Sequence, residues 1–198
     1  MKISLDIDGV FANFTDRVKE IASKLFPGKI PEGYIPTDWY YSDIFSKEDL
    51  SAVFNEISKT QNFWLYSVPY PENVSTLNSF LEKTNEHDIY FVTSRAPAAG
   101  LTVANQTRLW LEMAAGIHRS GNFTSIIPVA SSKYKADVMR AAGIQYSLDD
   151  HGPTVEECNQ VEGHQAFLLD RPWNRDREYG PRLDSVQQFF DIVTGKVN

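Results

Sequence analysis

Apolar runs that are each followed by a helical pattern constrain the fold of this chain more than any other feature of its sequence. From residue 72 onward, the apolar segments 89–95, 124–130, 144–150 and 165–170 alternate with segments whose apolar residues recur at helical spacing. Strands that are apolar on both faces and joined by helices are typical of parallel sheets that are covered on both sides. The sequence therefore predicts an α/β domain with three layers, α/β/α.

The same patterns predict where the remaining elements lie. A first strand is expected over residues 2–8, where Ile3, Leu5 and Ile7 alternate with polar residues. The start and stop signals of helices, such as the sequence Pro27-Gly28 after residue 26, set the ends of the others. Helices are expected over residues 14–26, 47–59, 73–84, 101–115, 134–142, 154–160 and 183–194.

Residues 16–70 do not follow this alternation. The segment is rich in aromatic residues, and prolines interrupt it between its two helical patterns. We interpret it as a small, mostly helical insert that lies over one edge of the sheet. The expected organisation is a core domain of residues 1–15 and 71–198, with residues 16–70 as a cap.

Polar side chains stand where three of the predicted strands end. Ligand sites of open parallel sheets lie at the carboxyl ends of the strands, so these side chains are expected to share one rim. Each has an ordinary alternative, because Asp and hydroxyl residues at strand ends often cap helices or form turns. Their joint arrival in this order favours a site. The residues are Asp6 and Asp8, Thr93, Ser94 and Arg95, and Asp149 and Asp150, with Lys133 and Lys135 before the last strand.

Composition limits the class of protein. A chain of 198 residues can bury a sizeable core, and its formal charge of −7 argues against broad nucleic-acid binding. The single cysteine, Cys158, excludes an intramolecular disulfide. No stretch approaches 18 apolar residues and the start carries no apolar leader, so no membrane span is expected and a cytoplasmic location is predicted.

The ordered polar set resembles the four motifs of the haloacid dehalogenase-like (HAD) phosphohydrolase superfamily. Asp6-Ile7-Asp8-Gly9-Val10 matches the first motif, D-x-D-G-[VT], and Thr93 matches the second. Lys135, with Lys133 as the alternative, matches the third, and Asp149-Asp150 matches the fourth. The resemblance implies the Rossmann-like HAD fold, with a cap inserted between the first and second motifs.

The presence of Asp8 bears on the reaction. Dehalogenases of this superfamily lack the second acid of the first motif, so Asp8 favours phosphoryl transfer. Response-regulator receivers also place acids, a threonine and a lysine on a parallel sheet, but in a different order along the chain. A phospho-switch binding module is therefore the non-enzyme alternative, and the order of the motifs speaks against it.

The resemblance implies a role in phosphoryl transfer for each motif residue. Asp6 would be the nucleophile that forms an aspartyl-phosphate, and Asp8 would exchange protons with the leaving group and with water. A Mg²⁺ cofactor would be bound by oxygens of Asp6, Asp8 (through its backbone carbonyl) and Asp149. The remaining implied roles are orientation of the metal shell by Asp150, and contacts to phosphoryl oxygens by Thr93, Ser94 and Lys135.

A closer resemblance concerns the substrate. The stretches DIDGVFANF, FWLYSVPYPENV and FLLDRPWN resemble segments of the 5'(3')-deoxyribonucleotidase family, which implies a nucleoside monophosphate as the partner of the site. Phe14 and Phe63 are expected to contact the base, with Trp39 and Trp64 second to them. Arg95 would either reach the phosphate or sugar, or pair with a nearby acid.

Other substrates stay open at this point. A phosphatase for a sugar phosphate or another small phosphoester fits the same motifs, as does a polynucleotide 3'-phosphatase, although the net negative charge disfavours the latter. A protein that binds nucleotides without turnover is also compatible with the sequence. The pattern indicates neither a monomer nor a homodimer.

Overall fold

The structure, a computed structural model, describes residues 1–83, 86–117 and 123–196. The strands are β1 (Lys2–Leu5), β2 (Ala12–Asn13), β3 (Val68–Pro69), β4 (Asp88–Thr93), β5 (Phe123–Pro128), β6 (Tyr146–Asp149), β7 (Gln165–Leu169) and β8 (Arg182–Leu183). The α-helices are α1 (Phe14–Leu25), α2 (Lys47–Lys59), α3 (Pro71–Lys83), α4 (Val103–Met113), α5 (Lys135–Ala142), α6 (Gly152–Cys158) and α7 (Val186–Val193). Short 3-10 helices are η1 (Phe63–Tyr66), η2 (Ser132–Tyr134) and η3 (Pro172–Asn174).

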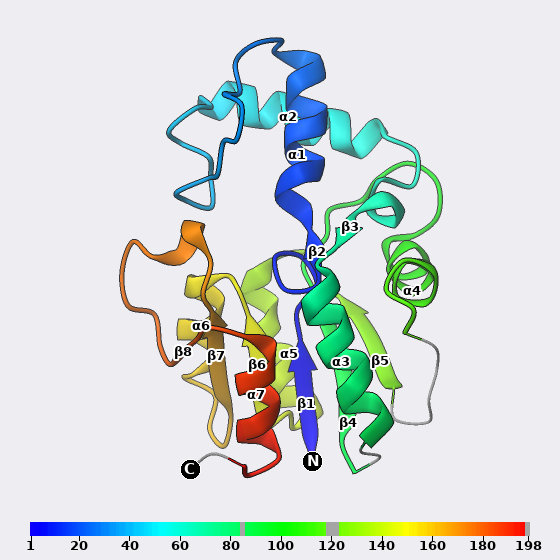
Figure 1. The fold of residues 1–198 in the computed structure, drawn as a ribbon, viewed down its shortest axis with the longest axis vertical. Coiled ribbons are helices and arrows are strands. Elements are labelled where there is room, and N and C mark those ends of the chain that lie inside the picture. Colours follow the sequence, from blue (N-terminus) through cyan, green and yellow to red (C-terminus); the bar gives the residue numbers. More distant parts are fainter. Residues whose placement is uncertain (84–85, 118–122, 197–198) are drawn as a thin grey trace.

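A parallel sheet forms the middle layer. Its strands lie in the order β5-β4-β1-β6-β7-β8, so β1 is central and pairs with β4 on one side and β6 on the other. Helices α3 and α7 cover one face, and α5 and α6 cover the other (Figure 1). The predicted three-layer α/β/α fold is confirmed, and the carboxyl ends of β1, β4 and β6 lie side by side.

The two apolar clusters on either side of the sheet follow from the two-residue period of its strands. Phe91 and Val92 are neighbours in β4, yet Phe91 packs with α3 and α7 while Val92 packs with α5 and α6. In β1, Ile3 and Leu5 are fully buried in the first cluster. Burial of both faces fixes the strands firmly, so the side chains that follow them have defined positions.

The predicted helix bounds agree with the structure where the sequence contains helix-capping residues. Helix α2 begins and ends where it was expected, and a reciprocal capping box of Ser46 and Asp49 sets its start. The first strand was expected to reach residue 8 but ends at Leu5. After it, the N–H groups of Val10, Phe11 and Ala12 all point at the carbonyl of Ile7, which makes a tight turn. Strands β2, β3 and β8 were not expected, since two residues carry no period.

Helices α1 and α2 lie beyond the carboxyl ends of the sheet, at the top of Figure 1. They have an apolar cluster of their own, formed by residues such as Val18, Ile21, Val53 and Ile57. The chain enters and leaves this region through the antiparallel ribbon of β2 and β3. The boundaries of a cap domain at residues 16–70 remain a prediction. None of the described helices is long and apolar enough to span a membrane.

Gly9 is predicted to be intolerant of a side chain. It lies in the turn after β1 with φ of +77°, and a Cβ there would lie 1.9 Å from Oδ2 of Asp150. Gly163 has a similar φ of +74° with nothing within 4 Å of an added Cβ. Gly163→Ala should therefore cost only the left-handed backbone term, about 1–2 kcal/mol, while Gly9→Ala should cost clearly more. Urea unfolding of both variants measures the difference, and equal losses would contradict the close packing of Gly9 on Asp150.

Candidate active site

Lys135 joins two acids at the ends of adjacent strands. Asp6 follows β1, and its N–H donates to the carbonyl of Leu148 at 3.0 Å, so the pairing with β6 continues to this residue. Lys135 is the first residue of α5, and its Nζ lies 3.0 Å from Oδ1 of Asp6 and 2.7 Å from Oδ2 of Asp149. The lysine is only 2% exposed. A buried ammonium group needs such partners, because burial removes the water that would otherwise solvate its charge.

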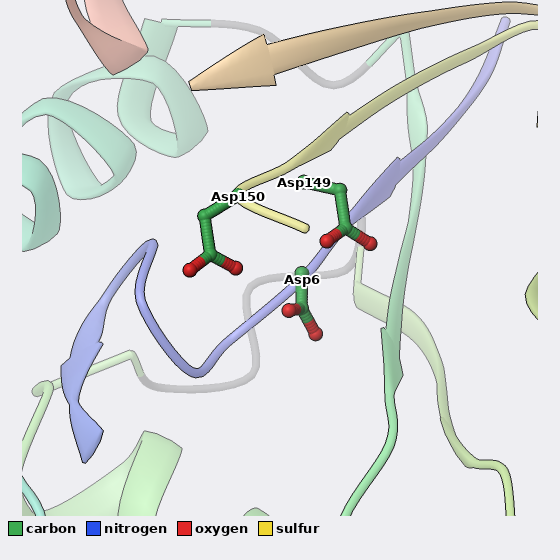
Figure 2. A group of neighbouring side chains, drawn as sticks. All are labelled: Asp6, Asp149 and Asp150. Atoms are coloured by element: carbon green, nitrogen blue, oxygen red, sulfur yellow. The ribbon is translucent and has the colours of Figure 1, made fainter. Parts of the chain in front are cut away.

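Asp6, Asp149 and Asp150 form a cluster of three buried carboxylates. One oxygen from each lies within 4.8 Å of the others, and Figure 2 shows the side chains gathered at the ends of β1 and β6. Burial raises the pKa of Asp6 to about 7, against the opposing effect of Lys135 and with a further rise from Asp149. Burial and the charges of Asp6 and Asp149 also raise the pKa of Asp150 well above its usual range.

A segment near the C-terminus holds Asp150 in place. The indole Nε1 of Trp173 donates to Oδ2 of Asp150 at 2.8 Å, and Nδ2 of Asn174 donates to the Asp150 carbonyl at 2.8 Å. Arg171 donates from Nε to the carbonyl of Gly9 at 2.6 Å, so the same segment also holds the turn after β1. The sequence reasoning noted the stretch FLLDRPWN but assigned it no contact, because nothing local to it reveals its distant partners.

Asp8 is paired with Arg95 instead of joining the cluster. Arg95 donates from Nε to Oδ2 at 2.7 Å and from Nη2 to Oδ1 at 2.9 Å. Thr93 donates to the same carboxylate at 3.4 Å. Of the two roles considered for Arg95, pairing with an acid is the one that the structure shows.

A cleft with about 770 Å³ of empty space opens above these groups. Its floor is polar and comes from the strand ends, and its walls carry aromatic side chains from the region of α1, α2 and η1. The lining residues are Asp6, Asp8, Phe14, Trp39, Phe54, Trp64, Thr93, Ser94, Ala96, Ala130, Ser132, Lys135 and His151. All the phosphate-binding residues expected from the sequence thus border one space, whereas Lys133 is not among its lining residues.

The expected base contacts are placed unequally. Phe14, Trp39 and Trp64 line the cleft, and the ring of Trp39 packs against that of His151, another lining residue, at 4.6 Å between centroids. Phe63 does not line it. Its side chain is 0% exposed and packs edge-on against Phe14 and Trp64, so the expectation that it contacts a base is wrong for this structure. Phe63 belongs to the apolar cluster formed with α1 and α2. The sequence alone could not distinguish it from the aromatic residues that line the cleft.

Phe54 is a wall residue that the sequence reasoning missed. It lies on α2, lines the cleft and keeps 40% of its surface exposed, with its ring centroid 6.5 Å from that of Phe14. The only local signal was an apolar residue beside the buried Val53 in the same helix. A second apolar residue next to a core position is common, so this signal is weak.

Comparison with known proteins supports the fold through structure alone. No family model and no curated protein matches the sequence. The L-2-haloacid dehalogenase from Xanthobacter autotrophicus with chloropropionic acid covalently bound is similar, with 12% identity, 99% of each chain covered and a TM-score of 0.62. YfnB of Bacillus subtilis, described as a HAD hydrolase bound to magnesium, has 12% identity, 98% of each chain covered and a TM-score of 0.60.

A haloacid dehalogenase-like family protein from Streptococcus pneumoniae is also similar, with 11% identity over 91% of this chain and 86% of that one, and a TM-score of 0.56. Identities this low establish a shared fold and leave the substrate open. These three structures do not show a 5'-nucleotidase subfamily for this chain. This chain has the fold of the haloacid dehalogenase-like hydrolases.

Proposed function

We propose that this protein is a magnesium-dependent phosphatase that hydrolyses nucleoside monophosphates through an aspartyl-phosphate. The observation that carries the proposal is the bridge of Lys135 between Asp6 and Asp149, with Asp8 on the floor of the same cleft. A lysine held beside a carboxylate nucleophile supplies positive charge where a phosphoryl group would lie. Asp8 favours phosphoryl transfer over cleavage of a carbon–halogen bond, for the reason given by the motif resemblance.

The reaction would proceed in two displacements at phosphorus. A carboxylate oxygen of Asp6 attacks the phosphorus, the bond to the leaving oxygen breaks with its electron pair, and that oxygen takes a proton from Asp8. Water then attacks the phosphorus of the acyl phosphate and gives a proton back to Asp8. The bond to Asp6 breaks and its carboxylate returns. The net change converts a monoester and water into an alcohol and inorganic phosphate.

The described residues fit a divalent metal. Oδ1 of Asp6 and Oδ1 of Asp150 are buried and have no hydrogen-bond partner, although the first lies near Lys135. Carboxylate oxygens are the ligands that Mg²⁺ prefers. Asp6, Asp149 and the carbonyl of Asp8 would hold the ion, with Asp150 beside them. When bound, the ion neutralises the excess negative charge and polarises the phosphoryl oxygens.

The aromatic walls support a substrate with a flat organic group. Phe14, Trp39 and Phe54 present ring surfaces to the cleft, whereas Trp64 borders it but is only 3% exposed. Aromatic side chains stack on nucleobases with little sequence preference. A sugar phosphate would leave these surfaces exposed to water. A nucleoside monophosphate therefore fits the cleft better than a phosphoester without a ring.

The first prediction concerns the nucleophile. Asp6→Asn should lower kcat on any accepted phosphomonoester by about 1,000-fold or more, because an amide cannot form the acyl phosphate. Asp137→Asn, an equally small change on an exposed residue of α5, should leave kcat unchanged. Steady-state release of phosphate measures both variants, and near-full activity of Asp6→Asn with native thermal stability would exclude the covalent mechanism.

The second prediction concerns metal and pH. Because burial raises the pKa of Asp6 from 3.8 to about 7, the folded protein without metal holds an extra proton between these values, and it should lose stability as pH rises from about 4 to 7. Mg²⁺ competes with that proton, so it should raise Tm more at pH 8 than at pH 5.5. Differential scanning fluorimetry measures this. Asp149→Asn should abolish the shift and Asp137→Asn should keep it, whereas a shift independent of both Asp149 and pH would argue against the site.

The third prediction concerns substrate class. A panel of deoxy- and ribonucleoside 5'-monophosphates, 3'-monophosphates, sugar phosphates and a 3'-phosphorylated oligonucleotide should show kcat/KM at least about tenfold higher for a nucleoside monophosphate than for the sugar phosphates. Trp39→Leu should reduce that preference by removing one ring surface. A panel with no preference for nucleotides would reject the nucleotide assignment and leave the phosphatase assignment intact.

A further inference from the structure

Arg95 is a buried arginine that contacts Asp8, the proposed proton donor, and does not line the cleft. It follows β4, its side chain is fully buried, and it is not among the residues that line the cleft. Its Nε and Nη2 reach separate oxygens of Asp8, at 2.7 Å and 2.9 Å. This paired geometry fixes both the position and the plane of a carboxylate, which a single contact cannot do.

Arg95 is itself fixed by three further contacts. Nη1 donates to Oγ1 of Thr107 at 3.0 Å, and the guanidinium carbon lies 5.0 Å from the Trp64 ring centroid and 5.9 Å from that of Trp110. Thr107 and Trp110 are three residues apart in α4 and therefore share a face of that helix. A guanidinium held on every side cannot turn toward a substrate without breaking several of these contacts.

Trp64 is also held firmly. Its backbone N–H donates to Oε1 of Gln106 at 3.0 Å, and its indole Nε1 donates to the carbonyl of Ala96 at 2.9 Å. Phe14 stacks on its ring at 5.5 Å between centroids, and Phe63 packs edge-on against it at 4.9 Å. The surroundings of Arg95 therefore consist of residues whose own positions are set by buried hydrogen bonds.

The consequence for Asp8 is a defined direction. A carboxylate offers about four lone-pair sites; Arg95 takes two of them, and the hydroxyl of Thr93 takes a third, on Oδ2. The remaining site is the one through which Asp8 borders the cleft, where the leaving oxygen and the attacking water would arrive. Proton exchange needs this alignment within a few tenths of an ångström and about 10–20°.

We propose that Arg95 is a positioning residue that orients the carboxyl group of Asp8 for proton exchange with the leaving group, without touching the substrate. This inference rests on the proposed phosphatase function. It predicts that loss of the paired contact harms substrates whose leaving group needs a proton and spares those whose leaving group departs unaided. A structural role alone would affect both kinds of substrate equally.

The test compares phenyl phosphate with 4-nitrophenyl phosphate, which differ little in size but strongly in their need for a proton on the leaving oxygen. Arg95→Lys keeps the charge but cannot bind both oxygens of Asp8. It should lower kcat for phenyl phosphate by about tenfold or more, the range of general acid catalysis, with a much smaller loss for 4-nitrophenyl phosphate and an unchanged KM for both. Arg140→Lys, on an exposed ion pair of α5, is the matched control and should change neither.

An Asp8→Asn background provides the second arm. If Arg95 acts through Asp8, then Arg95→Lys should cause no further loss once Asp8 is replaced. Thr107→Val removes only the hydrogen bond from Arg95 Nη1 to Thr107 Oγ1. It should also lower kcat for phenyl phosphate more than for 4-nitrophenyl phosphate, but by less than Arg95→Lys does. This variant replaces Arg95→Lys in the test if Arg95→Lys does not fold.

Equal losses on both phosphates, a rise in KM, or additivity with Asp8→Asn would overturn the inference. A wild-type protein that hydrolyses neither phosphate would instead reject the proposed function itself.

Discussion

The candidate site depends on one buried ion pair with three members. Lys135 lies between Asp6 and Asp149 and is almost fully buried, so removal of the lysine would leave two buried carboxylates without their cation. The contact is possible only because β1 and β6 are neighbours in the sheet while α5 begins at their carboxyl ends. The order of the strands therefore determines the chemistry that the cleft can perform.

A second set of contacts gives the acidic residues of the site different surroundings. Asp8 is bound by Arg95, while Asp150 is bound by Trp173 and by Asn174 through its carbonyl. Asp6 and Asp8 are two residues apart in the chain, yet they contact different cations. Asp6 contacts Lys135 at the start of α5, and Asp8 contacts Arg95 in the loop after β4. Neighbouring carboxylates can serve different purposes when their environments differ in this way.

Much of the fold could be predicted because the signals for it are local. Apolar runs and caps mark strands and helices, and Ser46 with Asp49 fixes the start of α2. Asp6, Asp149 and Lys135 could be placed together because parallel strands end at a common rim. The contact of Trp173 with Asp150 could not, because it spans 23 residues and has no pattern. Phe63 and Phe54 show the same limit, since only packing decides which aromatic is buried and which borders the cleft.

The contacts of the four acids also determine what their site must exchange with its surroundings. Among the described residues of the site, Asp6, Asp8, Asp149 and Asp150 face Lys135 and Arg95, so two negative charges remain unmatched. Without a metal, protons can take up that excess, in keeping with the raised pKa of Asp6 and Asp150. A divalent cation that entered would displace those protons into the solvent. Because the buffer would take up those protons, the measured heat of metal binding would depend on the ionisation enthalpy of the buffer. Metal binding at this site would therefore be coupled to proton release.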